Sequence, residues 1–338
     1  KINMLRNFYR LPFSTLCLML LHFHYTNGDM KVICDRLEVG VYPTEKCTHL
    51  MGQRLKLLNN KVSLDEQFSF FKDDTDNKRN KILPFINFQS GEDSEVYENV
   101  AALARNQGFQ GVMVSLPHND LKEAYENISK PIFRLGLELY ISIGIYYVGL
   151  DRDIEPDIKS LGEIIKNKKD VNLVVEILPN MEQFEDLMKN KSQINTQRSY
   201  LEKRINYLTN QGFPASNLII MVAPYVFEYS TRLPITCAYK HDMEEFCKFN
   251  FGNKKLTSTN EVREIRCGGG ICSLKESSFL HREKIELLAG KNIGSFYFTG
   301  FPTRFHFYEL NDNQRKVCFE ELNVLIRSYI DAVPQSSK

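Results

Sequence analysis

The stretch G-F-Q-G-V-M-V-S-L-P, residues 108–117, decides the fold of this chain. Before it, apolar residues recur at helical spacing after a cap at Asp93 or Ser94, and Gly108 can end that helix. The apolar run 111–116 that follows is short, which is typical of a buried strand. The stretch therefore predicts a helix-to-strand junction in an α/β fold.

Similar apolar runs alternate with helical patterns along the rest of the chain. The candidate strands are 30–34, 49–58, 81–88, 111–116, 137–147, 172–178, 216–223 and 295–299. Further helical stripes are predicted at 201–208, between a cap at Ser278 and a terminator at Gly290, and at 318–329. Such alternation indicates parallel strands joined by crossover helices, and the count of eight favours a (β/α)8 TIM barrel over an open doubly wound sheet. Residues 230–276 interrupt the alternation, so we expect a short insertion between strand 7 and helix 7.

The first 28 residues have the pattern of a secretory signal peptide. Arg6 and Arg10 supply positive charge, residues 11–23 are apolar, and a small polar exit follows at 26–28. The alternative is an uncleaved anchor, although the apolar run is short for a bilayer span. We expect a secreted, extracellular protein whose barrel occupies residues 29–338.

The charge balance excludes some partner classes. Three of the 43 bases and none of the 42 acids lie in residues 1–28, so the remaining chain has a net charge of −2. A nearly neutral chain has no field to attract nucleic acid or an anionic membrane, and neither is expected as a partner.

Five ordered pieces of the chain carry a resemblance to a known family. Besides residues 108–117, they are Cys34 with C-T-H-L at 47–50, K-I-L-P-F-I-N-F at 81–88, residues 206–225, and residues 278–305 with G-S-F-Y-F at 294–298. Together they resemble the chitinases of glycoside hydrolase family 18, from about Cys34 to Cys318. This resemblance also implies a TIM barrel.

The catalytic acids of that family are missing. Its catalytic strand reads G-F-D-G-x-D-x-D-x-E, and the four acidic positions here are Gln110, Met113, Ser115 and Pro117. In the family the terminal Glu is the general acid, while a carboxylate stabilises the intermediate formed by the substrate's acetamido oxygen. Pro117 cannot donate a proton, and Met113 and Ser115 cannot hold a negative charge. The resemblance therefore implies a catalytically inactive, chitinase-like pseudoenzyme.

A glycan ligand remains the leading expectation. In the resemblance, Phe298 corresponds to the Trp on which the sugar stacks at the barrel floor, and Tyr225 matches a family Tyr. The chain contains no Trp. We expect binding of a chitin-type oligosaccharide at these two residues, or a role as a lectin or growth-factor-like secreted factor with a protein receptor.

Two alternatives stay open. A divergent hydrolase could use relocated carboxylates at Asp120 and Glu176, although Asp120 can equally cap a helix and Glu176 can be paired or solvated. His118 could act as an acid–base group, but a lone loop histidine is more often simply exposed. The second alternative is a protein-binding scaffold whose former cleft is filled by side chains.

The cysteines fit a secreted, disulfide-bonded chain. The resemblance implies the pairs Cys34–Cys47 and Cys247–Cys318. Cys267 and Cys272 could close a small loop around Gly268–Gly270. Cys237 is then the one cysteine after residue 28 that belongs to none of these pairs. A zinc site of Cys237, Cys247, Cys267 and Cys272 lacks the usual knuckle spacing, so we expect no metal or other cofactor.

Two sequons predict glycosylation at Asn127 and Asn190. The sequence contains no nucleophile elbow, H-E-x-x-H or Walker loop, so no other enzyme class is indicated.

Overall fold

The computed structural model describes the parts of the chain that form the barrel and its surroundings. These are residues 30–35, 47–51, 55–58, 61–64, 80–85, 94–115, 121–145, 150–166, 168, 170–177, 194–222, 226–230, 238–241, 247, 249, 255–259, 263–298 and 311–332. The predicted signal peptide, residues 1–28, lies outside them.

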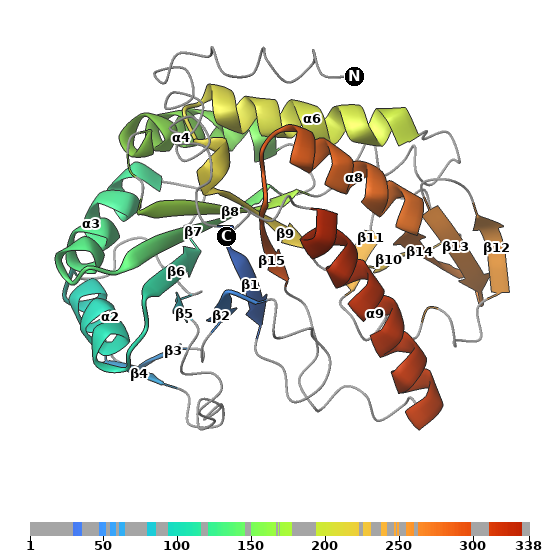
Figure 1. Ribbon diagram of the computed structural model, residues 1–338, viewed down its shortest axis with the longest axis horizontal. Helices are drawn as coiled ribbons and strands as arrows, with labels where there is room; N and C mark the ends of the chain where they lie inside the picture. The colour runs from blue at the N-terminus through green and yellow to red at the C-terminus, as the bar shows by residue number, and fades with distance from the viewer. Residues whose placement is uncertain are drawn as a thin grey trace, which may run out of the picture.

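Eight parallel strands close into a barrel, which confirms the predicted TIM-barrel fold (Figure 1). They are β1 (Val32–Asp35), β2 (His49–Met51), β5 (Asn80–Phe85), β6 (Gly111–Ser115), β7 (Glu138–Ile145), β8 (Val171–Ile177), β9 (Leu218–Val222) and β15 (Ser295–Phe298). Closure comes from β15, which pairs with both β9 and β1. Each barrel strand overlaps one predicted range.

One predicted strand is divided in the structure. The range 49–58 contains β2 and then β3 (Leu55–Leu58), which pairs antiparallel with β4 (Lys61–Leu64) in a separate hairpin. The prediction of one continuous strand was wrong because two neighbouring apolar runs in one sequence do not show which partner each will pair with.

Helices cover the outside of the barrel. They are α2 (Ser94–Asn106), α3 (Leu121–Arg134), α4 (Leu150–Ile165), α6 (Ile194–Asn210), α8 (Ser278–Gly290) and α9 (Asp312–Ala332), with a short 3₁₀ turn, η5 (Ala215–Asn217). In Figure 1, α2 and α3 lie on one side of the barrel and α8 and α9 on the opposite side. Gly108 follows α2 with a φ of 75°, a conformation that favours glycine.

The start of α8 differs from the prediction by one residue. Ser277, not Ser278, is the N-cap, because its hydroxyl oxygen accepts a hydrogen bond from the Leu280 backbone N–H at 3.1 Å.

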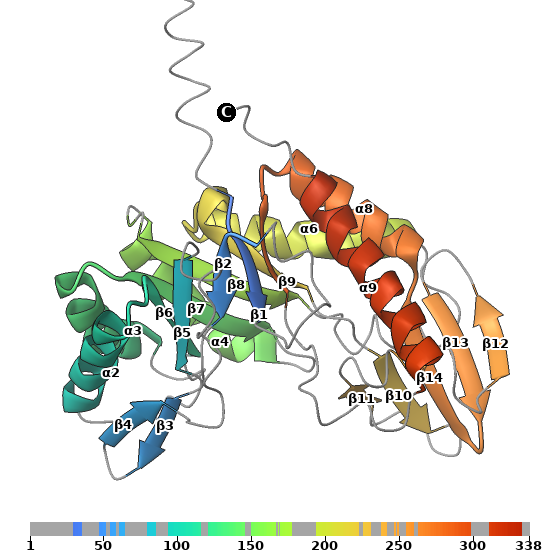
Figure 2. The same ribbon diagram turned by 60° about the horizontal axis from the view of Figure 1, so that its bottom comes forward.

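The insertion after strand 7 forms a second sheet. Its strands are β10 (Val226–Ser230), β11 (Ala238–His241), β12 (Lys255–Thr259), β13 (Arg263–Gly268) and β14 (Ile271–Glu276), in the antiparallel order β11-β10-β14-β13-β12. Figure 2 shows this sheet beside α9, far from the β3–β4 hairpin. The insertion begins at β10, a few residues before the expected residue 230.

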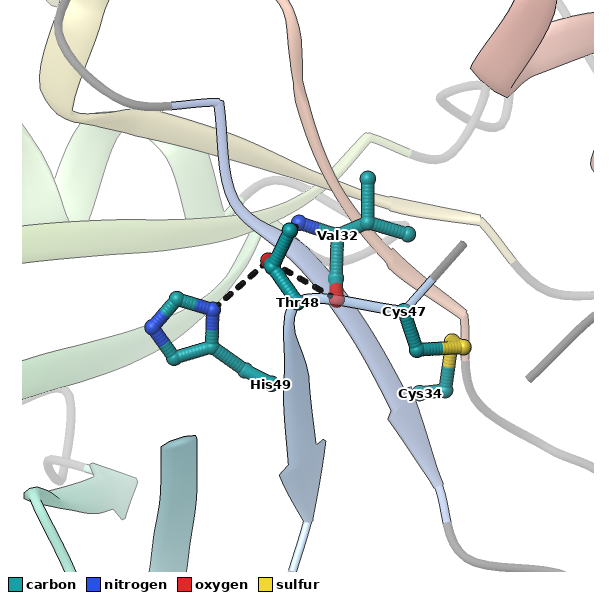
Figure 3. Close-up of a disulfide and its surroundings, with 5 residues drawn as sticks. All are labelled: Val32, Cys34, Cys47, Thr48 and His49. Atoms are coloured by element: carbon teal, nitrogen blue, oxygen red, sulfur yellow. Dashed lines mark hydrogen bonds between the residues drawn. A yellow bond between two sulfur atoms is a disulfide. The ribbon is translucent and has the colours of Figure 1, made fainter. Parts of the chain in front are cut away.

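Three disulfides join the pairs named from the sequence. Cys34 is bonded to Cys47, Cys247 to Cys318 and Cys267 to Cys272. The first ties β1 to the start of β2, beside hydrogen bonds between Val32 and Thr48 (Figure 3). The second ties the insertion to α9. Cys237 lies outside the described residues.

Candidate functional site

The barrel interior shows which side chains could face a ligand. Its buried cluster contains one residue from every barrel strand: Ile33, Met51, Ile82, Met113, Tyr140, Val174, Ile219 and Tyr297. Side chains alternate along strands, and the stagger of an eight-stranded barrel sorts inward residues into layers of four from alternate strands. The lower layer is therefore Ile33, Ile82, Tyr140 and Ile219, and the upper layer is Met51, Met113, Val174 and Tyr297.

Met113 lies in the upper layer, toward the carboxyl ends of the strands, where ligands of this fold bind. The family places one of its acids at this position. Here the side chain is 5% exposed, and the other members of its layer are Met51, Val174 and Tyr297. These neighbours offer no cation to stabilise a carboxylate. The four residues of the upper layer include no carboxylate.

The other three degenerate positions lie along or beyond β6. Gln110 precedes the strand, and its exposed side chain donates a hydrogen bond to the Gly108 carbonyl at 3.0 Å. Ser115 is the last residue of β6. Pro117 lies outside the described residues. The described part of β6 thus contains no carboxylate.

Phe298 does not form the floor of a sugar cleft, and this prediction was wrong. Its side chain is 0% exposed in the layer between barrel and helices, and its ring centroid is 6.3 Å from that of Phe296 and 6.3 Å from that of Tyr329 on α9. The reason is strand alternation: Tyr297 points into the barrel, so Phe298 points out. Tyr297, 8% exposed, is the ring of β15 inside the barrel.

Tyr225, Asp120, His118 and Asn190 lie outside the described residues. Glu176 belongs to β8, but its side chain is not described. Asn127 lies exposed on α3, as a glycan acceptor requires. Among the described residues no group of His, Cys, Asp and Glu side chains could hold a metal ion.

A charged cluster that the sequence patterns did not indicate lies at the amino-terminal end of the barrel. Lys31 Nζ lies 2.5 Å from Glu138 Oε2, and the Tyr140 hydroxyl donates to the same oxygen at 2.5 Å. The His49 ring nitrogen Nδ1 is 2.8 Å from the Thr48 hydroxyl (Figure 3). The His49 ring lies edge-on to that of Tyr140. His49 is a polar residue at the start of an otherwise apolar strand, and this departure from the pattern could have indicated the cluster.

The charges and hydrogen bonds of this cluster indicate a role in stability. Burial, and then the charge of Lys31, lower the pKa of His49 to about 4, so the ring is neutral at pH 7. Burial alone would raise the pKa of Glu138, but the bonds from Lys31 and Tyr140 outweigh it and leave the pKa lowered. Polar groups at the amino-terminal face of a TIM barrel serve stability, since catalysis occurs at the other end.

A second missed cluster lies behind Phe298, between α8 and α9. His281 Nδ1 is 3.1 Å from the Tyr329 hydroxyl, and Lys284 Nζ lies 2.6 Å from Glu276 Oε2. Burial lowers the pKa of His281 to about 4. The first contact joins α8 to α9, and the second joins α8 to the end of β14.

Several solved structures share this fold. Neither a protein-family profile nor a curated protein matches the sequence. The group IV chitinase of Ostrinia furnacalis superposes with a TM-score of 0.62 at 12% identity, over 91% of this chain and 100% of that one. The fold is that of the chitinases.

Two other solved structures carry the same fold. The family 18 chitinase of Cycas revoluta, in complex with (GlcNAc)3, has a TM-score of 0.58 at 13% identity over 90% of this chain and 99% of that one. Human YKL-39, described as a pseudo-chitinase with retained chitooligosaccharide binding, has a TM-score of 0.59 at 15% identity over the same shares. Identities this low show a common fold, and they leave the activity to be argued from the residues.

Proposed function

We propose that this protein is a secreted, non-catalytic, chitinase-like member of glycoside hydrolase family 18 that binds a chitin-type glycan weakly. The observation that carries the proposal is Met113, buried in an apolar layer at the position of a catalytic-strand acid. The substitutions at Gln110, Ser115 and Pro117 support it from the sequence.

Secretion is supported by two features of the chain. Residues 1–28 have the pattern of a signal peptide, and three disulfides join segments of the mature protein. Disulfides of this kind persist in oxidising compartments and are rare in the cytosol. Among the described residues no helix is long and apolar enough to cross a membrane.

Glycan binding is supported by the chitinase-like fold. YKL-39, a pseudo-chitinase with this fold, retains binding of chitooligosaccharides. In the present chain the ligand would lie above the upper layer, at the carboxyl ends of the strands, where Met221 of β9 and Tyr297 of β15 lie on neighbouring strands. Because no described carboxylate or amide of the upper layer reaches toward an acetamide, we expect little preference for N-acetylated sugars.

Calorimetry with two matched tetrasaccharides tests this proposal. Chitotetraose and cellotetraose share their backbone linkage and differ in the acetamido groups. We expect weak binding of both, with dissociation constants within about tenfold of each other, or about 1.4 kcal/mol. Tight binding of chitotetraose alone would show that an acetamide pocket exists and would contradict the proposed site.

A protein-binding scaffold is the second candidate, and one observation favours it. Met51 and Met113 are each 5% exposed, Val174 is 0% exposed and Tyr297 is 8% exposed, so side chains fill the upper layer. A filled interior leaves little depth for a sugar ring. The absence of heat with either tetrasaccharide would favour this candidate over the first. Relocated catalysis at Asp120 and Glu176 stays a prediction without structural support.

A further inference from the structure

A third layer of inward residues lies below the two apolar ones. It consists of the residues two positions before each upper-layer residue on the same four strands: His49, Gly111, Asn172 and Ser295. Since alternate residues face the same side of a strand, these four also point toward the barrel axis. All are buried: His49 is 5% exposed, Asn172 is 3% exposed and Ser295 is 5% exposed.

At Gly111, Ser295 and His49, other protein atoms fill the adjacent space or lie within hydrogen-bond distance. The Tyr140 ring takes the space beside Gly111, where an added Cβ would lie 2.6 Å from the ring carbon Cε2. The Ser295 hydroxyl oxygen accepts the Lys31 backbone N–H at 3.0 Å, and His49 Nδ1 lies 2.8 Å from the Thr48 hydroxyl.

Asn172 is different. Its amide nitrogen Nδ2 is buried, and it has no hydrogen-bond partner among the described residues. A side-chain amide has two N–H donors, and burial of unsatisfied donors is unfavourable. Its alternation with Val174, which belongs to the interior cluster, directs it into the barrel rather than toward the helices.

We propose that the bottom layer of the barrel binds one internal water molecule between Asn172 and Ser295. Asn172 Nδ2 donates to the water oxygen, and the water donates to the free lone pair of the Ser295 hydroxyl. The two residues come from alternate barrel strands, β8 and β15, and belong to the same inward layer. Buried waters in proteins occupy polar sites of this kind with two to four partners.

The chemistry of the layer selects a small neutral ligand. Lys31 and Glu138 neutralise one another at 2.5 Å just below it. Asn172, Ser295 and Gly111 carry no charge, and His49 is neutral at pH 7 because burial lowers its pKa. An ion would therefore find no counter-charge, while water can both accept from the amide and donate to the hydroxyl.

A crystal structure of the secreted protein at high resolution tests the proposal directly. We expect a solvent peak within about 3.2 Å of both Asn172 Nδ2 and Ser295 Oγ. An Asn172 amide bonded directly to a protein oxygen, with no peak beside it, would overturn the proposal.

A solution measurement gives an independent result. Water oxygen-17 relaxation dispersion counts long-lived internal waters, and we expect Asn172→Leu to lose one. Val174→Leu changes the same strand two residues after Asn172 and is the matched control. It should keep the wild-type number of internal waters. An unchanged count in Asn172→Leu would refute the proposal. If that variant does not fold, the wild-type crystal structure alone decides.

Discussion

Tyr297 and Phe298 are neighbours in β15, yet their rings lie on opposite sides of the barrel wall. Tyr297 belongs to the interior cluster, whereas Phe298 packs against Phe296 and Tyr329 beneath α9. This separation assigns the two rings different roles. Tyr297 is available to the barrel interior, and Phe298 contributes to the attachment of α9.

Substitution of Phe298 should therefore reduce stability and leave glycan affinity unchanged. We expect Phe298→Ala to lower the free energy of unfolding by about 3–5 kcal/mol, because it opens a cavity in a fully buried layer. Urea unfolding measures the loss, and calorimetry with chitotetraose measures affinity. Phe279→Ala, at a ring 39% exposed on α8, is the matched control and should cost much less. A large affinity change with little loss of stability would restore Phe298 to the binding site.

The disulfides should differ in their contribution to stability. Loop-closure entropy predicts about 4 kcal/mol for Cys247–Cys318, which are 71 residues apart, and about 2 kcal/mol for Cys267–Cys272, which are 5 apart. Paired Cys→Ser variants of each bridge, compared by urea unfolding, measure the difference. Equal losses would indicate that the longer bridge does not constrain the unfolded chain as expected.

Stability should fall as the pH is lowered from 6.5 toward 4. His49 and His281 have folded-state pKa values of about 4, while an unfolded histidine titrates near 6.5. The unfolded chain therefore binds more protons in this window, so the stabilisation is complete above pH 6.5 and is lost toward pH 4. Glu138 and Glu276 have lowered pKa values, so their stabilising contribution is present above the unfolded pKa, near 4.5, and is lost only as the pH falls below it.

Urea midpoints at pH 7, 6 and 5 separate these contributions. We expect a loss on the order of 1–2 kcal/mol per pH unit, and a shallower dependence in His49→Gln and in His281→Gln. Wild-type slopes in both variants would assign the dependence to other groups.

Asn127 should carry a glycan when the protein is secreted from a eukaryotic cell. The side chain is exposed on α3, and Ser129 completes the sequon. Mass spectrometry before and after enzymatic deglycosylation measures occupancy, and Asn127→Gln should remove one glycan. A mass difference between wild type and variant equal to the one added methylene alone would show that the site is unused.

Much of the fold follows from local patterns in the sequence. The eight barrel strands were predicted because each is a short apolar run with a helical pattern beside it. The cap of α8 was misplaced from Ser277 to Ser278, since two adjacent serines have equal capping ability in sequence. The β3–β4 hairpin was missed because strand pairing depends on tertiary contacts.

The candidate site was harder to predict. The replacement of the family's acids along β6 is visible in the sequence, and the structure places Met113 inside the barrel. Phe298 was misassigned because the family resemblance matches residue types. In a strand of four residues, such a match does not show which side chains face into the barrel and which face out. The cluster joins Lys31, just before β1, to His49 of β2 and Glu138 of β7, so only the closed barrel brings it together.

Turnover of a fluorogenic chitobioside tests the central claim most directly. The purified secreted protein, Pro117→Glu and the combined Met113→Asp, Ser115→Asp, Pro117→Glu variant would be assayed beside an active family 18 chitinase. We predict no turnover by wild type or Pro117→Glu, because loss of general acid catalysis alone costs about 10²–10⁴-fold and the supporting acids are also missing. Wild-type turnover near the rate of the active chitinase, in protein free of contaminating enzyme, would contradict the account.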